Sequence, residues 1–222
     1  MNRADRFPHR FILFTRYPAA GTTKTRLAPL LGPEGAARLQ RCLTEDMVER
    51  LERAAGEIGA GVEIRFTGGG RAEMEAWLGA GPLLAPQGEG DLGARLDRAF
   101  TGAFAGGAER VLVMGSDIPG IGVDLLRRGV ARLGERDAVV GPCPDGGYYL
   151  VGFRREGYAP RIFEGMPWGG PRVLARTLAR LEAEGVRFTL LEERHDLDRE
   201  EDLLRFAREE AAAGGAWPRT RA

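Results

Sequence analysis

The sequence has few of the residues that build disulfides and transition-metal sites. Its 222 residues include two cysteines, Cys42 and Cys143, and two histidines. Neither cysteine stands at a spacing typical of a metal-ligand or redox motif. This scarcity argues against a disulfide-stabilised fold and favours a reduced, cytoplasmic compartment.

The chain also lacks net charge and long apolar runs. Lysine and arginine number 32, as do aspartate and glutamate, so the formal net charge is zero. A neutral chain gives no reason to expect nucleic acid or an anionic membrane as a partner. No apolar run could cross a bilayer, and residues 1–10 lack the apolar segment of a signal peptide. We therefore expect a cytoplasmic protein with local binding sites; a homodimer stays open.

What the sequence does contain is a regular alternation of short apolar runs and amphipathic segments. Strands are predicted at residues 11–15, 62–67, 83–84, 111–114, 138–140, 148–153 and 186–191. Helices are predicted at 33–51, 72–78, 92–104, 123–133 and 171–184, and from about 199 to 212. Residues 154–170 show no periodicity. The alternation predicts a mostly parallel sheet covered by helices on both faces, in a single domain over residues 1–212 with a loose tail at 213–222.

Polar clusters follow the predicted strands. They are Arg16 to Arg26, Gln87 to Asp91, Ser116-Asp117, Asp145, and Asp196 with Asp198. In open α/β sheets, ligands bind outside the carboxyl ends of the strands. We therefore expect these cations and carboxylates to meet in one crevice.

The stretch from residue 16 to residue 27 has the composition of a phosphate-binding turn. Arg16, Lys24 and Arg26 surround a Gly/Thr-rich turn that contains Gly21. Main-chain N–H groups at the following helix start would favour an anion there. The alternative is a solvated surface turn. The stretch does not match a P-loop, because Thr23 stands where that motif requires glycine.

Three further residues after predicted strands are candidate nucleotide contacts. They are Gln87, Gly88 and Ser116. Gly88 would permit the close approach of a ligand to the main chain, although a plain loop would explain it equally well.

Asp117 and Asp198 are the candidate ligands of a divalent cation. Mg²⁺ or Mn²⁺ takes oxygen ligands, commonly one or two carboxylates with phosphate oxygens and water. Asp117 could instead accept hydrogen bonds in a turn, and Asp198 with Glu201 has the spacing of a helix capping box. If Asp117 holds the metal, Asp117→Asn is expected to remove metal-dependent nucleotide binding with little effect on the melting temperature of the apo protein.

The remaining candidates would contact a second substrate. Asp145 joins Lys24 and Asp117 as a candidate catalytic residue, although the Asp-Gly pair it begins is also a common turn signal. His195 has the chemistry of an acid or base, but a lone histidine beside an acid is more often structural. The candidate acceptor contacts are Asp145, Gly146, Gly147, Trp168 and Asp196. Trp168 could equally be a packing residue.

These motifs together resemble one family. The matching segments are residues 14–18, 21–27, Gly88-Glu-Gly-Asp-Leu-Gly93, Gly115-Ser-Asp-Ile-Pro119, 141–150, Pro167-Trp168 and Asp196-Leu-Asp-Arg-Glu-Glu-Asp-Leu203. They resemble the GT-A-fold nucleotide-diphospho-sugar or glycosyl transferases of the radical-SAM/selenodomain-associated type. The resemblance covers residues 11–203 and extends to MobA-like nucleotidyltransferases.

The resemblance implies a three-layer α/β/α GT-A fold that binds a nucleotide in its N-terminal half. It also implies a divalent metal at Asp117 with Asp198, and phosphates at Lys24 and Arg26. One departure concerns the metal strand, where many GT-A glycosyltransferases carry Asp-x-Asp and this chain has one acid. In that respect the chain is similar to the guanylyltransferase that activates phospholactate.

Three functions stay open on these observations. The first is transfer from a nucleotide-diphospho-sugar to an unknown small-molecule acceptor, which we favour. The second is nucleotidyl transfer from an NTP to a phosphorylated small molecule, with release of pyrophosphate. The third is a nucleotide-binding module without turnover.

Overall fold

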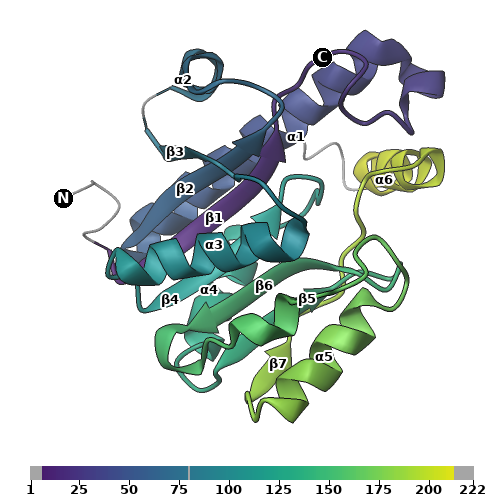
Figure 1. Cartoon of the computed structure of the whole chain (residues 1–222). Helices are drawn as coiled ribbons and strands as arrows, with labels where there is room; N and C mark the ends of the chain where they lie inside the picture. Colours follow the sequence, from purple (N-terminus) through teal and green to yellow (C-terminus); the bar gives the residue numbers. More distant parts are fainter. Residues whose placement is uncertain (1–6, 80, 213–222) are drawn as a thin grey trace.

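The structure is a computed structural model that describes residues 7–79 and 81–212 (Figure 1). One sheet of seven strands forms its centre, in the order β3-β2-β1-β4-β6-β5-β7. The strands are β1 (His9–Arg16), β2 (Ala60–Thr67), β3 (Leu83–Pro86), β4 (Arg110–Gly115), β5 (Ala138–Pro142), β6 (Tyr148–Arg154) and β7 (Phe188–Leu190). The predicted tail at 213–222 lies outside the described residues.

Six α-helices connect and cover these strands. They are α1 (Ala28–Ile58), α2 (Arg71–Leu78), α3 (Leu92–Ala105), α4 (Val123–Arg132), α5 (Val173–Ala183) and α6 (Glu200–Ala212). Two short 3₁₀ helices, Arg155–Gly157 and Pro160–Phe163, lie in the segment without predicted structure. Among the helices of the described ranges, none combines the length and the apolar character that crossing a membrane requires.

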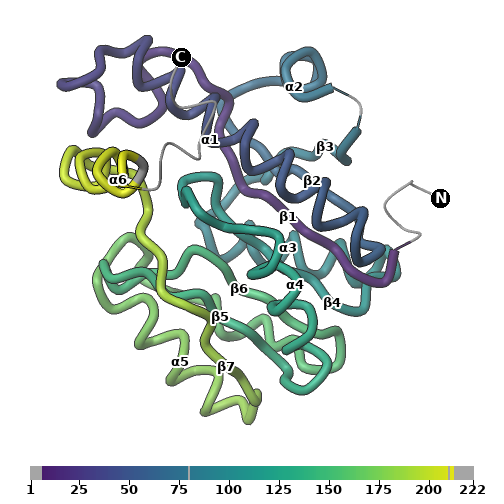
Figure 2. Tube along the Cα trace, turned by 180° about the vertical axis from the view of Figure 1, so that it is seen from behind, coloured from purple at the N-terminus to yellow at the C-terminus, as the bar shows by residue number. Residues whose placement is uncertain are grey.

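Helices pack on both faces of the sheet, as Figures 1 and 2 show. On one face, Met47 and Leu51 of α1 join Leu126 of α4 in an apolar cluster with β1, β2 and β4. On the other face, Phe100 of α3 and Leu181 of α5 pack with β4, β5 and β6. The predicted α/β fold with helices on both faces is therefore confirmed.

The sheet is mostly parallel, with one exception. β6 runs antiparallel to both β4 and β5, while the four other strand pairs are parallel. A short connection after β5 makes a hairpin, because only antiparallel strands can be joined by a few residues. The loop at residues 143–147 therefore still lies at the same edge as the carboxyl ends of the parallel strands.

Helix α1 is longer than predicted and begins before the predicted start. It opens at Ala28, and the backbone leaves helical geometry at Gly32 (φ 70°, ψ 163°) before Pro33 restarts the helix. The prediction had placed the start at Pro33, which is in fact the position of the kink.

The first and last parts of the chain meet beside this kink. Leu27 and Leu43 pack with Leu197 in a small apolar cluster that Leu203 and Phe206 of α6 extend. Figures 1 and 2 both show α6 next to the segment that leads from β1 into α1. This contact brings the predicted phosphate-binding turn and the predicted C-terminal acids together.

Candidate functional site

A cavity of about 410 Å³ opens at the carboxyl ends of β1, β2, β3 and β4. It lies where parallel α/β sheets bind their ligands. Six predicted site residues line it, and they are Arg16, Lys24, Gln87, Ser116, Asp117 and Asp198. Thr22, Thr23 and Thr25 of the predicted turn also line it, together with residues that the sequence did not single out, among them Thr15, Gln40, Thr67 and Leu92.

Lys24 is buried within this cavity. Its side chain is 2 % exposed, and Nζ lies 3.0 Å from Asp117 Oδ2. Nζ also donates to the carbonyl oxygen of Leu197 at 2.6 Å. Lys24 has φ +48°, a left-handed conformation that is uncommon for a residue with a side chain. Its ammonium thus ties the predicted phosphate-binding turn to the end of β4 and to the C-terminal segment.

Asp198 makes a second ion pair across the same edge. Its Oδ2 lies 2.5 Å from Nη1 of Arg26, whose side chain is 63 % exposed. The main-chain N–H groups of Asp198 and Arg199 donate to Asp202 Oδ2, at 3.2 and 2.8 Å. Asp202, four residues after Asp198, therefore takes the place predicted for Glu201, and that capping prediction was wrong.

A buried polar network supports the floor of the cavity. Gln40 Nε2 lies 3.3 Å from Thr15 Oγ1, 3.2 Å from Thr44 Oγ1 and 3.0 Å from Ser116 Oγ. All four residues are at most 4 % exposed. Ser116 Oγ in turn donates to Asp117 Oδ1 at 3.3 Å. Buried hydroxyl and amide groups satisfied in this way fix one another's positions, so the network orients the Asp117 carboxylate.

Sequence reasoning missed Gln40 and Thr44, although a signal for them exists. Both fall on the apolar stripe of α1 that Ala36, Leu43 and Met47 define, and both are buried. A polar residue on the core face of an amphipathic helix has to find a buried hydrogen-bond partner. Two such residues four positions apart indicate a buried polar network under that face.

The loop after β3 is held by hydrogen bonds to the ends of β1 and β2 and to α3. Gln87 Nε2 donates to the carbonyl oxygens of Thr15 and Arg65, each at 3.1 Å, so its amide joins the ends of β1 and β2. Arg98 Nη1 donates to the Gln87 carbonyl oxygen at 2.7 Å. A Cβ at Gly88 would lie 2.5 Å from that guanidinium group. The glycine therefore makes room for Arg98.

The loop between β5 and β6 is a tight turn packed on α5. Asp145 Oδ1 accepts from the main-chain N–H of Gly147 at 2.8 Å. Leu174 N–H donates to the Gly146 carbonyl oxygen at 2.8 Å. Trp168 packs against Tyr148 and Phe163, with ring centroids 6.4 Å apart in each pair. These contacts supply the structural roles that had been weighed against acceptor binding.

Asp196 lies within a group of acids next to Lys24. Burial raises the pKa of the Asp196 carboxyl, and the charges of Asp145, Asp202 and Asp198 raise it further, whereas Lys24 lowers it. These acidic groups place a negative potential next to the cavity. This negative potential lies opposite the cations of the predicted phosphate-binding turn.

Cys143, at the start of the β5–β6 loop, offers no nucleophile at neutral pH. Cys143 is buried, and burial together with the charges of Asp145 and Asp196 raises its pKa to about 12. A thiol with such a pKa stays protonated and unreactive.

The residues present fit a hard divalent cation. Asp117 and Asp198 line one cavity with side chains 44 % and 31 % exposed, and the Ser116 hydroxyl lies 3.3 Å from Asp117 Oδ1. Within residues 7–79 and 81–212, no three His, Cys, Asp or Glu side chains gather in a set that could hold a metal ion. Two carboxylates that leave the other positions to phosphate and water suit Mg²⁺ or Mn²⁺.

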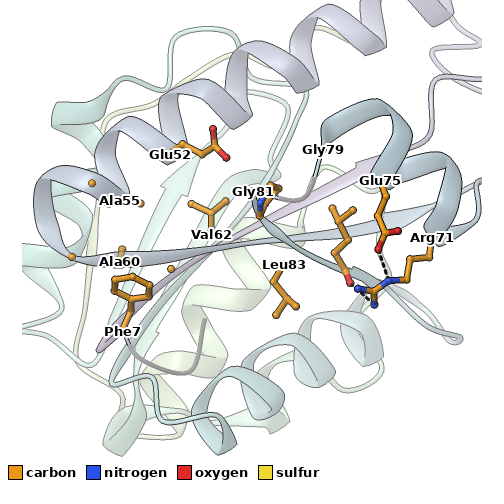
Figure 3. Close-up of a pocket in the computed structure, with 15 residues that line it drawn as sticks. Phe7, Glu52, Ala55, Ala60, Val62, Arg71, Glu75, Gly79, Gly81 and Leu83 are labelled. Atoms are coloured by element: carbon orange, nitrogen blue, oxygen red, sulfur yellow. Dashed lines mark hydrogen bonds and ion pairs between the residues drawn. The ribbon is translucent and has the colours of Figure 1, made fainter. Parts of the chain in front are cut away.

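A second cavity of about 540 Å³ lies at the opposite edge of the sheet (Figure 3). It is bounded by the end of α1, the amino ends of β2 and β3, and α2. Its polar side chains include Arg71 and Glu75, which form an ion pair of 2.7 Å. Glycine and apolar residues make up most of its wall, and none of the predicted site residues lines it.

Solved structures share this fold. A candidate nucleotide-diphospho-sugar transferase from Desulfovibrio desulfuricans G20 is 34 % identical, with a TM-score of 0.87 over 92 % of this chain and 88 % of that one. A CMP:2-keto-3-deoxy-manno-octonic acid synthetase complexed with CTP is 13 % identical, with a TM-score of 0.55 over 92 % and 99 %. The manganese complex of Rv0371c from Mycobacterium tuberculosis H37Rv is 20 % identical, with a TM-score of 0.50 over 90 % and 98 %.

These similarities confirm the predicted GT-A-like α/β/α fold. No curated protein sequence matches the chain significantly. A family profile described as "Uncharacterized protein conserved in bacteria (DUF2064)" matches residues 38–170, which is more than half of the chain. The profile match and the 34 % identical relative, which aligns over most of both chains, agree. The chain therefore belongs to the DUF2064 family.

Proposed function

We propose that this protein is a metal-dependent transferase that uses a nucleotide-diphospho-sugar. The observation that carries the proposal is the single cavity in which Lys24 and Arg16 face Asp117 and Asp198. The 34 % identical relative is described as a candidate nucleotide-diphospho-sugar transferase, which supports the same substrate class. We also propose that the protein is related to the radical-SAM/selenodomain-associated transferases.

Each side of the cavity has its own role in the proposal. Arg16, Lys24 and Arg26 would hold the diphosphate, with main-chain groups near Gly21 and Gly88. Asp117 and Asp198 would hold Mg²⁺ or Mn²⁺, which would supply Lewis-acid stabilisation of the departing diphosphate. The manganese complex of a protein with this fold is consistent with such a site.

The acceptor would enter from the side of the β5–β6 loop. Asp145, Gly146 and Gly147 lie at the same sheet edge as the cavity, and Asp145 acts electrostatically on Asp196. An acceptor hydroxyl in this region would attack the anomeric carbon, and the bond from that carbon to the diphosphate would break. Lys24, Asp117 and Asp145 are the proposed catalytic residues.

Nucleotidyl transfer is the second candidate, and one observation favours it. Only Asp117 supplies an acid at the end of β4, where many GT-A glycosyltransferases have two. The synthetase complexed with CTP shares the fold, and CTP is a nucleoside triphosphate. In this reaction a substrate phosphate would attack the α-phosphorus and pyrophosphate would leave in line. If the protein catalyses this reaction, we expect it to be related to MobA-like enzymes.

Thermal-shift measurements with NTPs and NDP-sugars, with and without Mn²⁺, test the proposal. Nucleotide and Mn²⁺ together are expected to raise the melting temperature of the wild type, and Asp117→Asn is expected to abolish the Mn²⁺-dependent part. Asp124→Asn is the matched control, because that side chain is 77 % exposed on α4. Lys24→Ala is expected to weaken nucleotide binding by roughly 1.5–3 kcal/mol, the range for hydrogen bonds to charged groups.

The reaction products distinguish glycosyl transfer from nucleotidyl transfer. Release of a nucleoside diphosphate on addition of an acceptor supports glycosyl transfer, whereas release of pyrophosphate from an NTP overturns it in favour of nucleotidyl transfer. Binding without turnover against a broad panel of acceptors would point to a nucleotide-binding module. No stabilisation by any nucleotide, with or without Mn²⁺, would refute all three.

A further inference from the structure

Each carboxylate proposed to hold the metal is already paired with a cation proposed to hold phosphate. Lys24 Nζ lies 3.0 Å from Asp117 Oδ2, and Arg26 Nη1 lies 2.5 Å from Asp198 Oδ2. The two sets of ligand groups therefore neutralise each other in the absence of ligands. Arg16, the third cation predicted to bind phosphate, instead donates to the carbonyl oxygen of Thr22 at 3.0 Å.

The Lys24 pair is the more enclosed of the two. The lysine side chain is 2 % exposed, and a second acceptor, the Leu197 carbonyl oxygen, lies 2.6 Å from Nζ. A divalent cation that approached Asp117 alone would meet this ammonium group at close range. Like charges so near to each other repel, because an ammonium group that is 2 % exposed is poorly screened by solvent.

A phosphate that arrived alone would face the converse obstacle. It would have to draw Lys24 and Arg26 away from their carboxylates and leave Asp117 without a cation in a partly buried position. Separating such a pair without replacing the lost partner is costly. When metal and phosphate arrive together, each carboxylate exchanges one cation for another, and each basic side chain exchanges one anion for another.

We propose that these two ion pairs make metal binding depend on the nucleotide, so that the metal alone binds poorly and the two ligands load together. The inference rests on the proposed function, since it takes Asp117 and Asp198 as metal ligands and Lys24 and Arg26 as phosphate ligands. By linkage, a nucleotide that raises the affinity for metal has its own affinity raised by the same factor.

Binding of Mn²⁺ alone, measured from the electron paramagnetic resonance signal of free Mn²⁺, is the decisive test. Lys24→Met and Arg26→Met each replace the cation of one pair with a neutral side chain. Lys24→Met is expected to bind Mn²⁺ alone at least roughly tenfold more tightly than the wild type, and Arg26→Met, whose pair is more exposed to solvent, roughly threefold more tightly. Arg26 is 63 % exposed, so its variant tests the idea even if Lys24→Met fails to fold. Arg71→Met is the matched control, because it also removes an arginine from an ion pair and is 64 % exposed, but lies at the other cavity; it is expected to change Mn²⁺ affinity less than roughly twofold.

A second measurement separates the inference from the function it rests on. The affinity of the wild type for UDP, GDP, CDP and ADP is measured by calorimetry with and without excess Mn²⁺, and at least one is expected to bind roughly tenfold more tightly with Mn²⁺. If nucleotides bind in this way but Mn²⁺ alone binds the wild type as tightly as the Arg26→Met and Lys24→Met variants, the dependence is refuted and the proposed function stands. If neither these diphosphates nor the corresponding triphosphates bind in either condition, the proposed function fails.

Discussion

Substitution of Gly146 by alanine distinguishes a packing role from a ligand-binding role in the β5–β6 loop. Gly146 has φ +87°, and a Cβ there would overlap the main-chain carbonyl group of Pro171. That obstacle is backbone, so it cannot rotate away as a side chain could. The hydrogen bond from Leu174 N–H to the Gly146 carbonyl, at 2.8 Å, holds the turn against the start of α5.

The expected loss has two parts. A residue with a side chain in the left-handed region costs about 1–2 kcal/mol. Overpacking against a fixed neighbour adds about 1–3 kcal/mol. Gly146→Ala is therefore expected to lower the free energy of unfolding by about 2–5 kcal/mol, which corresponds to a drop in melting temperature of roughly 4–20 °C for a chain of this size.

Gly21→Ala is the matched control in this experiment. Gly21 has φ +77°, but no atom lies within 4 Å of a Cβ built there, so only the conformational part of the loss applies. Urea denaturation of the three proteins yields the free energies of unfolding by linear extrapolation. If Gly146→Ala loses no more stability than Gly21→Ala, the turn is not packed on α5 as described, and a contact with substrate becomes the better explanation of the glycine.

Two further predictions concern stability. Arg187 and Arg154, which bond to Asp137, lower the pKa of that carboxyl to about 2. Because the pKa is lower in the folded protein, the ionised carboxylate stabilises the fold fully above the unfolded pKa near 4, and this stabilisation is lost as the pH falls toward 2. The difference in unfolding free energy between the wild type and Asp137→Asn should therefore shrink over that range. Thr44→Val removes a hydroxyl with two buried partners and should cost about 1–3 kcal/mol in urea denaturation, against little for the exposed Thr101→Val. Equal losses in those two threonine variants would argue against the buried network, and a pH-independent difference for Asp137→Asn would argue against its ion pairs.

Much of the architecture could be predicted because it depends on local pattern. Val111 to Met114 and Phe11 to Leu13 are continuous apolar runs, and both became buried strands. Since parallel strands end at one edge, the polar residues that follow them had to gather there. That reasoning placed Lys24, Asp117 and Asp198 in one crevice, and all three line one cavity.

The pairing of side chains within the site could not be predicted in the same way. It depends on the packing of Leu27 and Leu43 against Leu197, which joins segments that are remote in the sequence. The burial of Lys24 against Asp117 also changes one expectation. Asp117→Asn should now destabilise the apo protein, because it leaves a 2 % exposed ammonium group without its carboxylate.

The contact between the two ends of the chain also sets an order of events during synthesis. The hydrogen bond from Lys24 to Leu197 spans 173 residues, and that from Arg26 to Asp198 spans 172. A ribosome releases the N-terminal half first, so β1, α1 and β2 can associate before residue 197 has been made. During that interval the lysine lacks the Leu197 carbonyl oxygen, one of its two partners, although Asp117 has been made earlier. The candidate site is thus among the last parts of the fold to be completed, and a chain that stops before Leu197 would have the sheet without the complete site.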